Sequence, residues 1–152
     1  MQVITEARLH APPEAVWPLL CSSKMDTDVP CLFRLGVPKP VECRLPDGVG
    51  AVGGRRQCIS DRGTIHQRIS HWESPRLLRF HMEDTNLRFR TSVKSLVDEF
   101  SLVATEGGGT IITRKTTFET VGFGRGVKAL VLSVGLKAVH RYVFRNWARL
   151  LA

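Results

Sequence analysis

The stretch HAPPEAVWPLLCSS, residues 10–23, follows an N-terminal strand pattern and predicts an abrupt change of structure. In residues 3–9 apolar and polar side chains alternate, which is typical of a half-buried strand. Pro12 and Pro13 suit the first positions of a helix, where a missing N–H costs nothing. Pro18 lacks the N–H that a helix interior needs, so the helix is short or kinked. The chain therefore begins with a strand that turns directly into a short, interrupted helix.

Length and composition favour one globular domain over residues 1–152. Hydrophobic residues make up 43% and charged residues 24%, which is the usual range for a globular protein that holds a core. No apolar run approaches the roughly 18 residues of a membrane span. Glu6 and Arg8 make the N-terminus unlike a signal peptide. We therefore expect a cytoplasmic protein with no integral membrane association.

The four cysteines are Cys21, Cys31, Cys43 and Cys58, and their spacing fits no known metal motif. There is no C-x-x-C pair and no histidine at zinc-finger spacing. The five histidines are scattered along the chain, and His66 and His71 lie five residues apart on one strand, which alternation places on opposite faces. We expect free thiols, no metal and, without a secretory segment, no disulfide framework.

The rest of the chain has strand patterns followed by one long helical pattern. Residues 22–48 are irregular, with one short helix expected near residues 25–35 and a strand near residues 41–45. Five further strands are expected at Arg55–Ser60, Thr64–Trp72, Leu77–Asp84, Leu96–Val103 and Thr110–Glu119. Their short connections predict antiparallel hairpins. A final amphipathic helix has its apolar stripe at Leu132, Leu136, Val139, Val143, Trp147 and Leu150. The fold class is therefore α+β.

The sequence resembles the START-like superfamily, also called SRPBCC, and within it the polyketide cyclase/dehydrase and lipid-transport group. The likeness rests on residues 11–17, residues 69–80, residues 108–114 and the terminal helix. It implies a helix-grip fold, in which a curved antiparallel sheet of about six or seven strands wraps around the long C-terminal helix and leaves an elongated cavity. The two short helices then prop the far end of the sheet. Family members bind lipids, steroids or polyketides, some cyclise or aromatise polyketides, and others activate a chaperone ATPase.

Strand alternation places many polar side chains on the inner face of the expected sheet. The predicted cavity residues are Gln57, Gln67, Ile69, His71, Phe80, Met82, Asp98, Phe100, Ile112, Arg114, Phe118, Leu132, Leu136, Val139 and Val143. Arg55, Ile59 and Asp84 fall on the same face. Each unpaired buried polar group costs about 1–3 kcal/mol, so a purely structural core does not explain them. A cavity that holds water or an apolar ligand with polar substituents does. The alternative is a bulge that inverts the alternation and leaves these side chains on the surface.

Two of these side chains have opposite charges on neighbouring strands. A hairpin that pairs Phe100 with Ile112 also pairs Asp98 with Arg114. We therefore expect an ion pair in the cavity wall, with Arg114 able to offer spare donors to a ligand carboxylate, carbonyl or phenol.

Two glycine-rich segments have different interpretations. The sequence of residues 48–53 reads GxGxxG, but a strand pattern follows where a dinucleotide site needs a helix, so we expect a hairpin and no cofactor. Residues 122–126 contain three glycines, and Gly122, Phe123 and Gly124 are expected to form a mobile lip at the cavity mouth. The alternative is a plain linker before the helix.

The net charge of +8 includes a basic ridge on the last helix, formed by Lys137, Arg141, Arg145 and Arg149. The ridge is a solvated face or a docking site for an acidic partner or an anionic lipid surface. No nucleic-acid module accompanies it, so we expect no nucleic-acid binding.

The function expected from these features is the binding of a small, largely hydrophobic molecule of lipid, polyketide or aromatic type in the internal cavity. One alternative is a cyclase or aromatase that uses inward Arg, Asp and His side chains for proton transfer. The single tyrosine, Tyr142, and the absence of an obvious acid–base pair disfavour this enzyme, and no catalytic residue is assigned. Another alternative is an interaction module that acts through the basic ridge.

Overall fold

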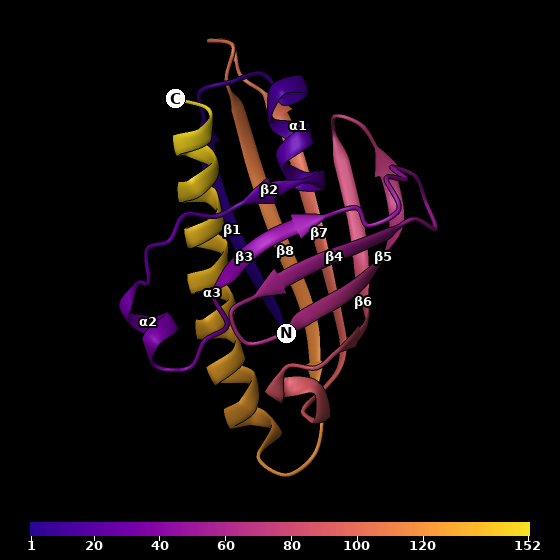
Figure 1. Cartoon of the computed structure of the whole chain (residues 1–152), viewed down its shortest axis with the longest axis vertical. Coiled ribbons are helices and arrows are strands. Elements are labelled where there is room, and N and C mark those ends of the chain that lie inside the picture. Colours follow the sequence, from indigo (N-terminus) through magenta and orange to yellow (C-terminus); the bar gives the residue numbers. More distant parts are fainter.

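A curved antiparallel sheet wraps around one long helix in the computed structural model, which describes residues 1–152 (Figure 1). The elements are β1 (Gln2–Leu9), α1 (Pro13–Cys21), β2 (Ser23–Lys24), α2 (Cys31–Arg34), β3 (Pro40–Arg44), β4 (Arg55–Ser60), β5 (Thr64–Glu73), β6 (Leu77–Thr85), the 3-10 helix η1 (Arg88–Thr91), β7 (Val93–Ala104), β8 (Thr110–Thr120) and α3 (Arg125–Leu150). The strand order is β1-β8-β7-β6-β5-β4-β3-β2. The α+β helix-grip fold is confirmed, with eight strands instead of six or seven because β2 adds a short edge strand.

The opening strand and helix carry the chain from one edge of the sheet to the other. β1 pairs with β8 at one edge, whereas β2 pairs with β3 at the opposite edge. Between them α1 spans only nine residues, with Pro13 in its first turn and Pro18 inside it. Its C-cap residue, Ser22, is already extended. The prolines thus limit α1 to the length that is needed to cross the end of the sheet.

The second short helix does not prop the end of the sheet, contrary to expectation. α2 lies beside α3 (Figure 1). There the rings of Phe33 and Tyr142 pack edge to face, with their centres 5.1 Å apart. The loop before α2 is also fixed to α3, because Asp26 accepts a hydrogen bond from the Tyr142 hydroxyl at 2.6 Å. Only α1 covers the end of the sheet.

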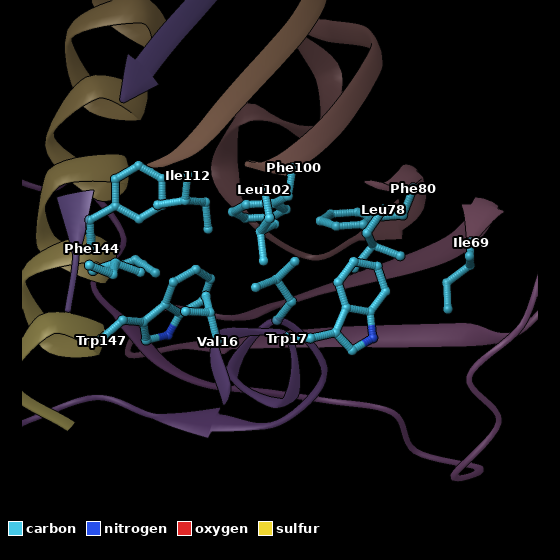
Figure 2. Close-up of a cluster of buried hydrophobic side chains, with 13 residues drawn as sticks. Val16, Trp17, Ile69, Leu78, Phe80, Phe100, Leu102, Ile112, Phe144 and Trp147 are labelled. Carbon is cyan, nitrogen blue, oxygen red and sulfur yellow. The ribbon is translucent and has the colours of Figure 1, made fainter. Parts of the chain in front are cut away.

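The main core lies between α1, the last turns of α3 and the inner face of the sheet (Figure 2). It comprises Leu9, Val16, Trp17, Leu20, Ile69, Leu78, Phe80, Phe100, Leu102, Ile112, Val143, Phe144 and Trp147. Trp147 is central, since its ring lies 5.7 Å from that of Phe100 and 5.8 Å from that of Phe144. Its indole N–H donates to Ser23 Oγ at 3.2 Å. This core fastens the C-terminal half of α3 to the sheet.

A second and smaller core lies under the N-terminal half of α3. It comprises Val3, Val93, Leu96, Phe118 and Ala129, with Met82, Leu132 and Leu136 packed against it half-buried. α3 is therefore held more loosely at its start than at its end. Neither α3 nor any other helix combines the length and the hydropathy that crossing a bilayer requires.

A bulge in β5 reverses the predicted orientation of His71. Ile69 pairs with Phe80, but His71 pairs with Arg79, so Ser70 is an extra residue in this strand. Trp72, not His71, then turns inward and packs against the main core. The prediction that His71 points inward is wrong.

The length of the β4–β5 loop likewise reverses the predicted face of β4. Ile59 pairs with Thr64 and Arg56 with Gln67, whereas the prediction paired the neighbouring residues of β4 with this face of β5. A shift of the pairing by one residue turns every side chain of β4 to the opposite face. Gln57, Arg55 and Ile59 therefore lie on the outer face, contrary to prediction.

A similar irregularity affects β6. His66 pairs with Asp84 and Gln67 with Met82, which leaves Glu83 as the extra residue. Thr85 is buried beyond it, whereas Asp84 is exposed and the prediction that it points inward is wrong.

Two of the cysteines form a disulfide, contrary to the expectation of free thiols. Cys43 and Cys58 lie directly opposite each other in the β3–β4 ladder, with their Cα atoms 4.2 Å apart. Cys21 and Cys31 remain free. The expectation of no disulfide rested on the lack of a secretory segment, and a separation of 15 residues does not by itself indicate that the two cysteines face each other.

Residues 48–53 form turns that lead into β4, and no helix begins there. A dinucleotide-binding turn therefore has no structural counterpart in this segment. Gly50 is needed for packing, because a Cβ atom at this position would lie 2.7 Å from the Trp72 ring.

Truncation of Trp147 tests the packing of α3 on the sheet. Trp147→Ala removes a side chain that is 1% exposed, and we expect it to lower the free energy of unfolding by about 3–5 kcal/mol in urea denaturation. Leu150→Ala in the same helical turn is the control, since Leu150 is largely exposed and its loss should change stability by less than about 0.5 kcal/mol. Equal effects of the two substitutions would contradict this placement of α3.

Candidate functional site: a buried charged network

Polar side chains from five strands and α3 converge inside the half-barrel. They form two hydrogen-bonded groups, which together are called the network: Thr5 from β1, Asp98 from β7, Arg114 and Thr116 from β8 and His140 from α3 in one, and Arg56 from β4 with Gln67 from β5 in the other. The charges of Asp98 and Arg114 act on Arg56, but no hydrogen bond joins the two groups. All are buried apart from a small exposed part of Arg114. Strand alternation predicted Gln67, Asp98 and Arg114 correctly.

Asp98 is the only carboxylate of the network, and it forms the predicted ion pair with Arg114. Arg114 Nε donates to Asp98 Oδ1 at 3.0 Å. The register differs from the predicted one by two residues, since Asp98 lies opposite Thr116 and Arg114 opposite Phe100. The ion pair is therefore diagonal across the two strands. Burial raises the pKa of Asp98, but the Arg114 charge and the hydrogen bonds from Arg114 and Thr116 outweigh burial and hold this pKa below its usual value.

His140 links α3 to this ion pair through Thr116. The Thr116 hydroxyl donates to Asp98, so it accepts from His140 Nε2 at 2.7 Å. His140 Nδ1 is then the acceptor for the Thr5 hydroxyl at 2.9 Å. Burial, and secondarily the Arg114 charge, lowers the pKa of His140 to about 3. His140 is therefore neutral at pH 7 and is fixed in one tautomer.

Arg56 is a member of the network that alternation placed on the wrong face. Its Nε donates to Leu20 O at 3.0 Å, and its Nη1 donates to Gln67 Oε1 at 2.7 Å and to Cys58 Sγ at 2.8 Å. The guanidinium lies 4.2 Å from the centre of the Phe80 ring. Burial, and secondarily the Arg114 charge, lowers the pKa of Arg56 to about 10. Arg56 thus remains a cation at pH 7 without a carboxylate of its own.

The network has one positive charge in excess. Arg56 and Arg114 carry two positive charges, Asp98 carries one negative charge and His140 is neutral. One further donor in the core lacks an acceptor, because the buried Nε1 of Trp17 has no hydrogen-bond partner. The excess positive charge favours a negatively charged or strongly accepting group at this site.

The surface has two shallow hollows, and neither borders the network. One of about 370 Å³ lies at the end of the sheet and is lined by Pro13, Glu14, Pro75, Arg76 and residues 101–104. The other, of about 200 Å³, adjoins the β7–β8 turn and is lined by residues 8–10, Thr105 and residues 107–110. The expected cavity between the sheet and α3 stays a prediction.

The other predicted cavity residues separate into three groups. Ile69, Phe80, Phe100, Ile112 and Val143 are in the main core beside the network, and Val139 packs on that core. Met82, Phe118, Leu132 and Leu136 belong to the smaller core. Gln57 and His71 are on the outer face, where Gln57 accepts from Arg44 and His71 contacts Glu73.

The predicted lip precedes α3. Gly122 and Gly124 have positive φ angles of 88° and 71°, which glycine adopts readily. Phe123 between them is 99% exposed and covers no cavity in this structure. Gating by this segment stays a prediction.

The basic ridge of α3 is partly occupied by contacts within the chain. Arg149 pairs with Asp26 at 2.7 Å and lies near Asp28, and Lys137 donates to a backbone oxygen of β1. Arg141 and Arg145 form no ion pair, although the Arg145 guanidinium lies over the Tyr142 ring. Lys137, Arg141 and Arg145 thus carry charges that no ion pair neutralises.

The family described as polyketide cyclase/dehydrase and lipid transport matches residues 1–152. The chain belongs to this family. The match covers every element of the half-barrel and α3, so the resemblance seen in the sequence is confirmed. No curated protein matches the chain.

Solved structures that resemble the chain share its fold at low sequence identity. A START superfamily protein from Mycobacterium smegmatis has a TM-score of 0.69 and 8% identity, with 99% of this chain and 96% of that chain covered. Protein MLL2253 from Mesorhizobium loti has a TM-score of 0.68 and 19% identity, with the same coverage. TTHA0849 from Thermus thermophilus has a TM-score of 0.67 and 13% identity, with 98% and 95% covered. These likenesses support the START-like fold.

Removing Arg114 tests the buried ion pair. Arg114→Met leaves Asp98 buried without its cation, and we expect a loss of about 3–5 kcal/mol in the free energy of unfolding. Asp98→Asn combined with Arg114→Met should recover part of that loss. Arg79→Met breaks the exposed pair with Glu99 and serves as the control, with an expected loss of about 0–1 kcal/mol. A loss below about 0.5 kcal/mol for Arg114→Met would contradict the buried pair.

The low pKa of His140 predicts a dependence of stability on pH. Between its ordinary value of 6.5 and its folded value of about 3, the unfolded chain binds a proton that the folded chain does not. Stability should therefore fall as the pH falls from about 6.5 towards 4. His140→Gln, whose amide can still hydrogen-bond both threonines, should flatten this slope in urea denaturation series. His66→Gln alters an exposed histidine and should leave the slope unchanged, and equal slopes in wild type and His140→Gln would refute the assignment.

Proposed function

We propose that the protein binds a small, largely apolar molecule between the sheet and α3, and that the molecule presents an anionic or strongly accepting group to the buried network. The family description, polyketide cyclase/dehydrase and lipid transport, supports ligands of this apolar class. The observation that carries the proposal is the excess positive charge of the network, with two buried guanidiniums and one carboxylate.

The energetic argument concerns Arg56. A buried charge without a counter-charge is costly unless hydrogen bonds and a partner compensate it. Three neutral acceptors solvate this guanidinium, and the Phe80 ring stacks beneath it. A ligand carboxylate, enolate or phenolate would supply the missing negative charge, and charge-assisted hydrogen bonds of this kind are about twice as strong as neutral ones.

The apolar part of the ligand requires a surface next to these charges. Phe80 and Phe100 line the same face of the sheet, and the Arg114 guanidinium lies 5.1 Å from the centre of the Phe100 ring. A planar or extended apolar ligand with one acidic end would contact these rings and the guanidiniums together. The half-buried residues Leu132 and Leu136 provide further apolar contact along α3.

A second candidate function is acid–base chemistry on such a ligand, as in a cyclase. The observation that favours it is the continuous hydrogen-bonded chain from Asp98 through Thr116 to His140 and Thr5. Proton transfer along the chain would need His140 to accept a proton, which its pKa of about 3 opposes at neutral pH. Ligand binding without catalysis is therefore the better supported function.

Competition between matched ligands tests the proposal. An apolar fluorescent probe bound to the protein should be displaced by a long-chain fatty acid about tenfold more effectively than by the alcohol of the same chain length, because a charge-assisted bond contributes about 1.5–3 kcal/mol. Arg56→Met should remove this preference for the acid while leaving displacement by the alcohol unchanged.

The ratio of the two affinities within one variant is the readout, so a moderate change in stability does not obscure the result. Arg62→Met in the exposed β4–β5 turn is the control for loss of a cation and should keep the preference. Equal displacement by acid and alcohol in the wild type would disprove the anionic preference, and absence of probe binding would disprove the apolar site.

A further inference from the structure

The N-terminal half of α3 presents an apolar face that no other element covers. Val127, Leu130, Val131 and Val134 are 70%, 62%, 66% and 52% exposed, and their three- and four-residue spacing places them on one side of the helix. Phe123 precedes the helix and is exposed almost completely. The opposite side of the same half faces the smaller core through Ala129. This half of α3 is therefore apolar on both sides, although only one side is buried.

Cations extend this apolar face towards the C-terminus. Arg141 and Arg145 lie seven and eleven residues after Val134, which is about two and three helical turns, and so they are on the same side of the helix. Neither arginine forms an ion pair. α3 contains six Lys and Arg residues and no Asp or Glu. The acidic residues that pair with α3, Asp26 and Asp28, contact Arg149 near its last turn, away from the apolar half. The exposed side of the helix thus combines apolar surface with unneutralised positive charge.

We propose that this side of α3 docks the protein on the surface of an anionic phospholipid bilayer. Phe123, Val127, Leu130, Val131 and Val134 form the docking face and insert at the boundary of headgroups and acyl chains, as amphipathic helices do. Arg141 and Arg145 contact the anionic headgroups. Because no helix can span the bilayer, the attachment is peripheral and reversible.

Charge favours a bilayer over a second copy of the chain on this face. Two such helices would bring together faces that carry cations and no acidic residue, within molecules of net charge +8 each. Like charges placed together in an interface are strongly unfavourable. An anionic lipid surface instead attracts the same charges, with a contribution of roughly a factor of five in binding for each Lys or Arg near it.

Flotation with vesicles tests the docking face. The wild type should float with vesicles of phosphatidylcholine and phosphatidylglycerol at low ionic strength, float weakly with phosphatidylcholine alone and be released by added salt. Leu130→Gln combined with Val131→Gln should weaken binding to the anionic vesicles by roughly tenfold or more, because both side chains lose their apolar contact. Arg141→Gln combined with Arg145→Gln should weaken it by roughly twentyfold.

Two matched controls separate the docking face from general surface properties. Val103→Gln removes an equally exposed apolar side chain at the far end of β7, and Arg8→Gln with Arg62→Gln removes two exposed cations elsewhere. Both should bind as wild type does. The proposal is overturned by failure to float with anionic vesicles, or by equal weakening in the controls and the α3 variants. It is also overturned by a dimer in sedimentation velocity that Leu130→Gln with Val131→Gln abolishes, since a second copy would then occupy the face.

Discussion

The hydrogen-bonded ion pair of Asp98 and Arg114 is the constraint on which the inner arrangement depends. It joins β7 to β8 near the β1 edge of the sheet, and through Thr116 it extends to His140 on α3. His140 then continues the chain to Thr5 on the edge strand β1. A single buried carboxylate thus ties α3 to β1, β8 and β7, the three strands at one edge of the sheet. The burial of Asp98 is tolerated because Arg114 and Thr116 donate hydrogen bonds to its carboxylate, and His140 in turn donates to Thr116.

The faces of β7 and β8 were predictable because these two strands pair without irregularity along most of their length. Alternation from Phe100 and Ile112 placed Asp98 and Arg114 inside, and both are. The error of two residues in register preserved every face, since side chains alternate with a period of two. It changed only which residues lie directly opposite, so the ion pair became diagonal.

The prediction failed where the ladder gains an extra residue or the loop length changes parity. The bulge at Ser70 turns His71 outward. The length of the β4–β5 loop places Arg56, and not the predicted Gln57, on the inner face. Arg56 was therefore not predicted as a site residue, although its charge gives the network its excess positive charge. Neither feature has a local sequence signal as strong as a proline or a glycine turn, because a bulge is selected by packing across strands. The Cys43–Cys58 pair was missed for a different reason, because the expectation rested on the lack of a secretory segment and not on the pairing of β3 with β4.

The inner network and the outer face of α3 suggest complementary roles. In the proposed function the network would offer a buried cation to an acidic, apolar molecule, and in the proposed docking the outer face would offer apolar and cationic contacts to the lipid bilayer in which such molecules accumulate. The N-terminal half of α3 carries the outer apolar face on one side and packs on the smaller core with the other, next to the glycines at residues 122 and 124.

The central claim is that the buried positive charge binds an acidic, apolar small molecule. The most direct measurement is native mass spectrometry of gently purified protein, followed by identification of any molecule released on denaturation. We expect a carboxylic acid, enol or phenol with a large apolar part, retained by the wild type and depleted in Arg56→Met. A protein that retains no molecule under these conditions, or one that retains a neutral or cationic molecule equally in both variants, would contradict the claim.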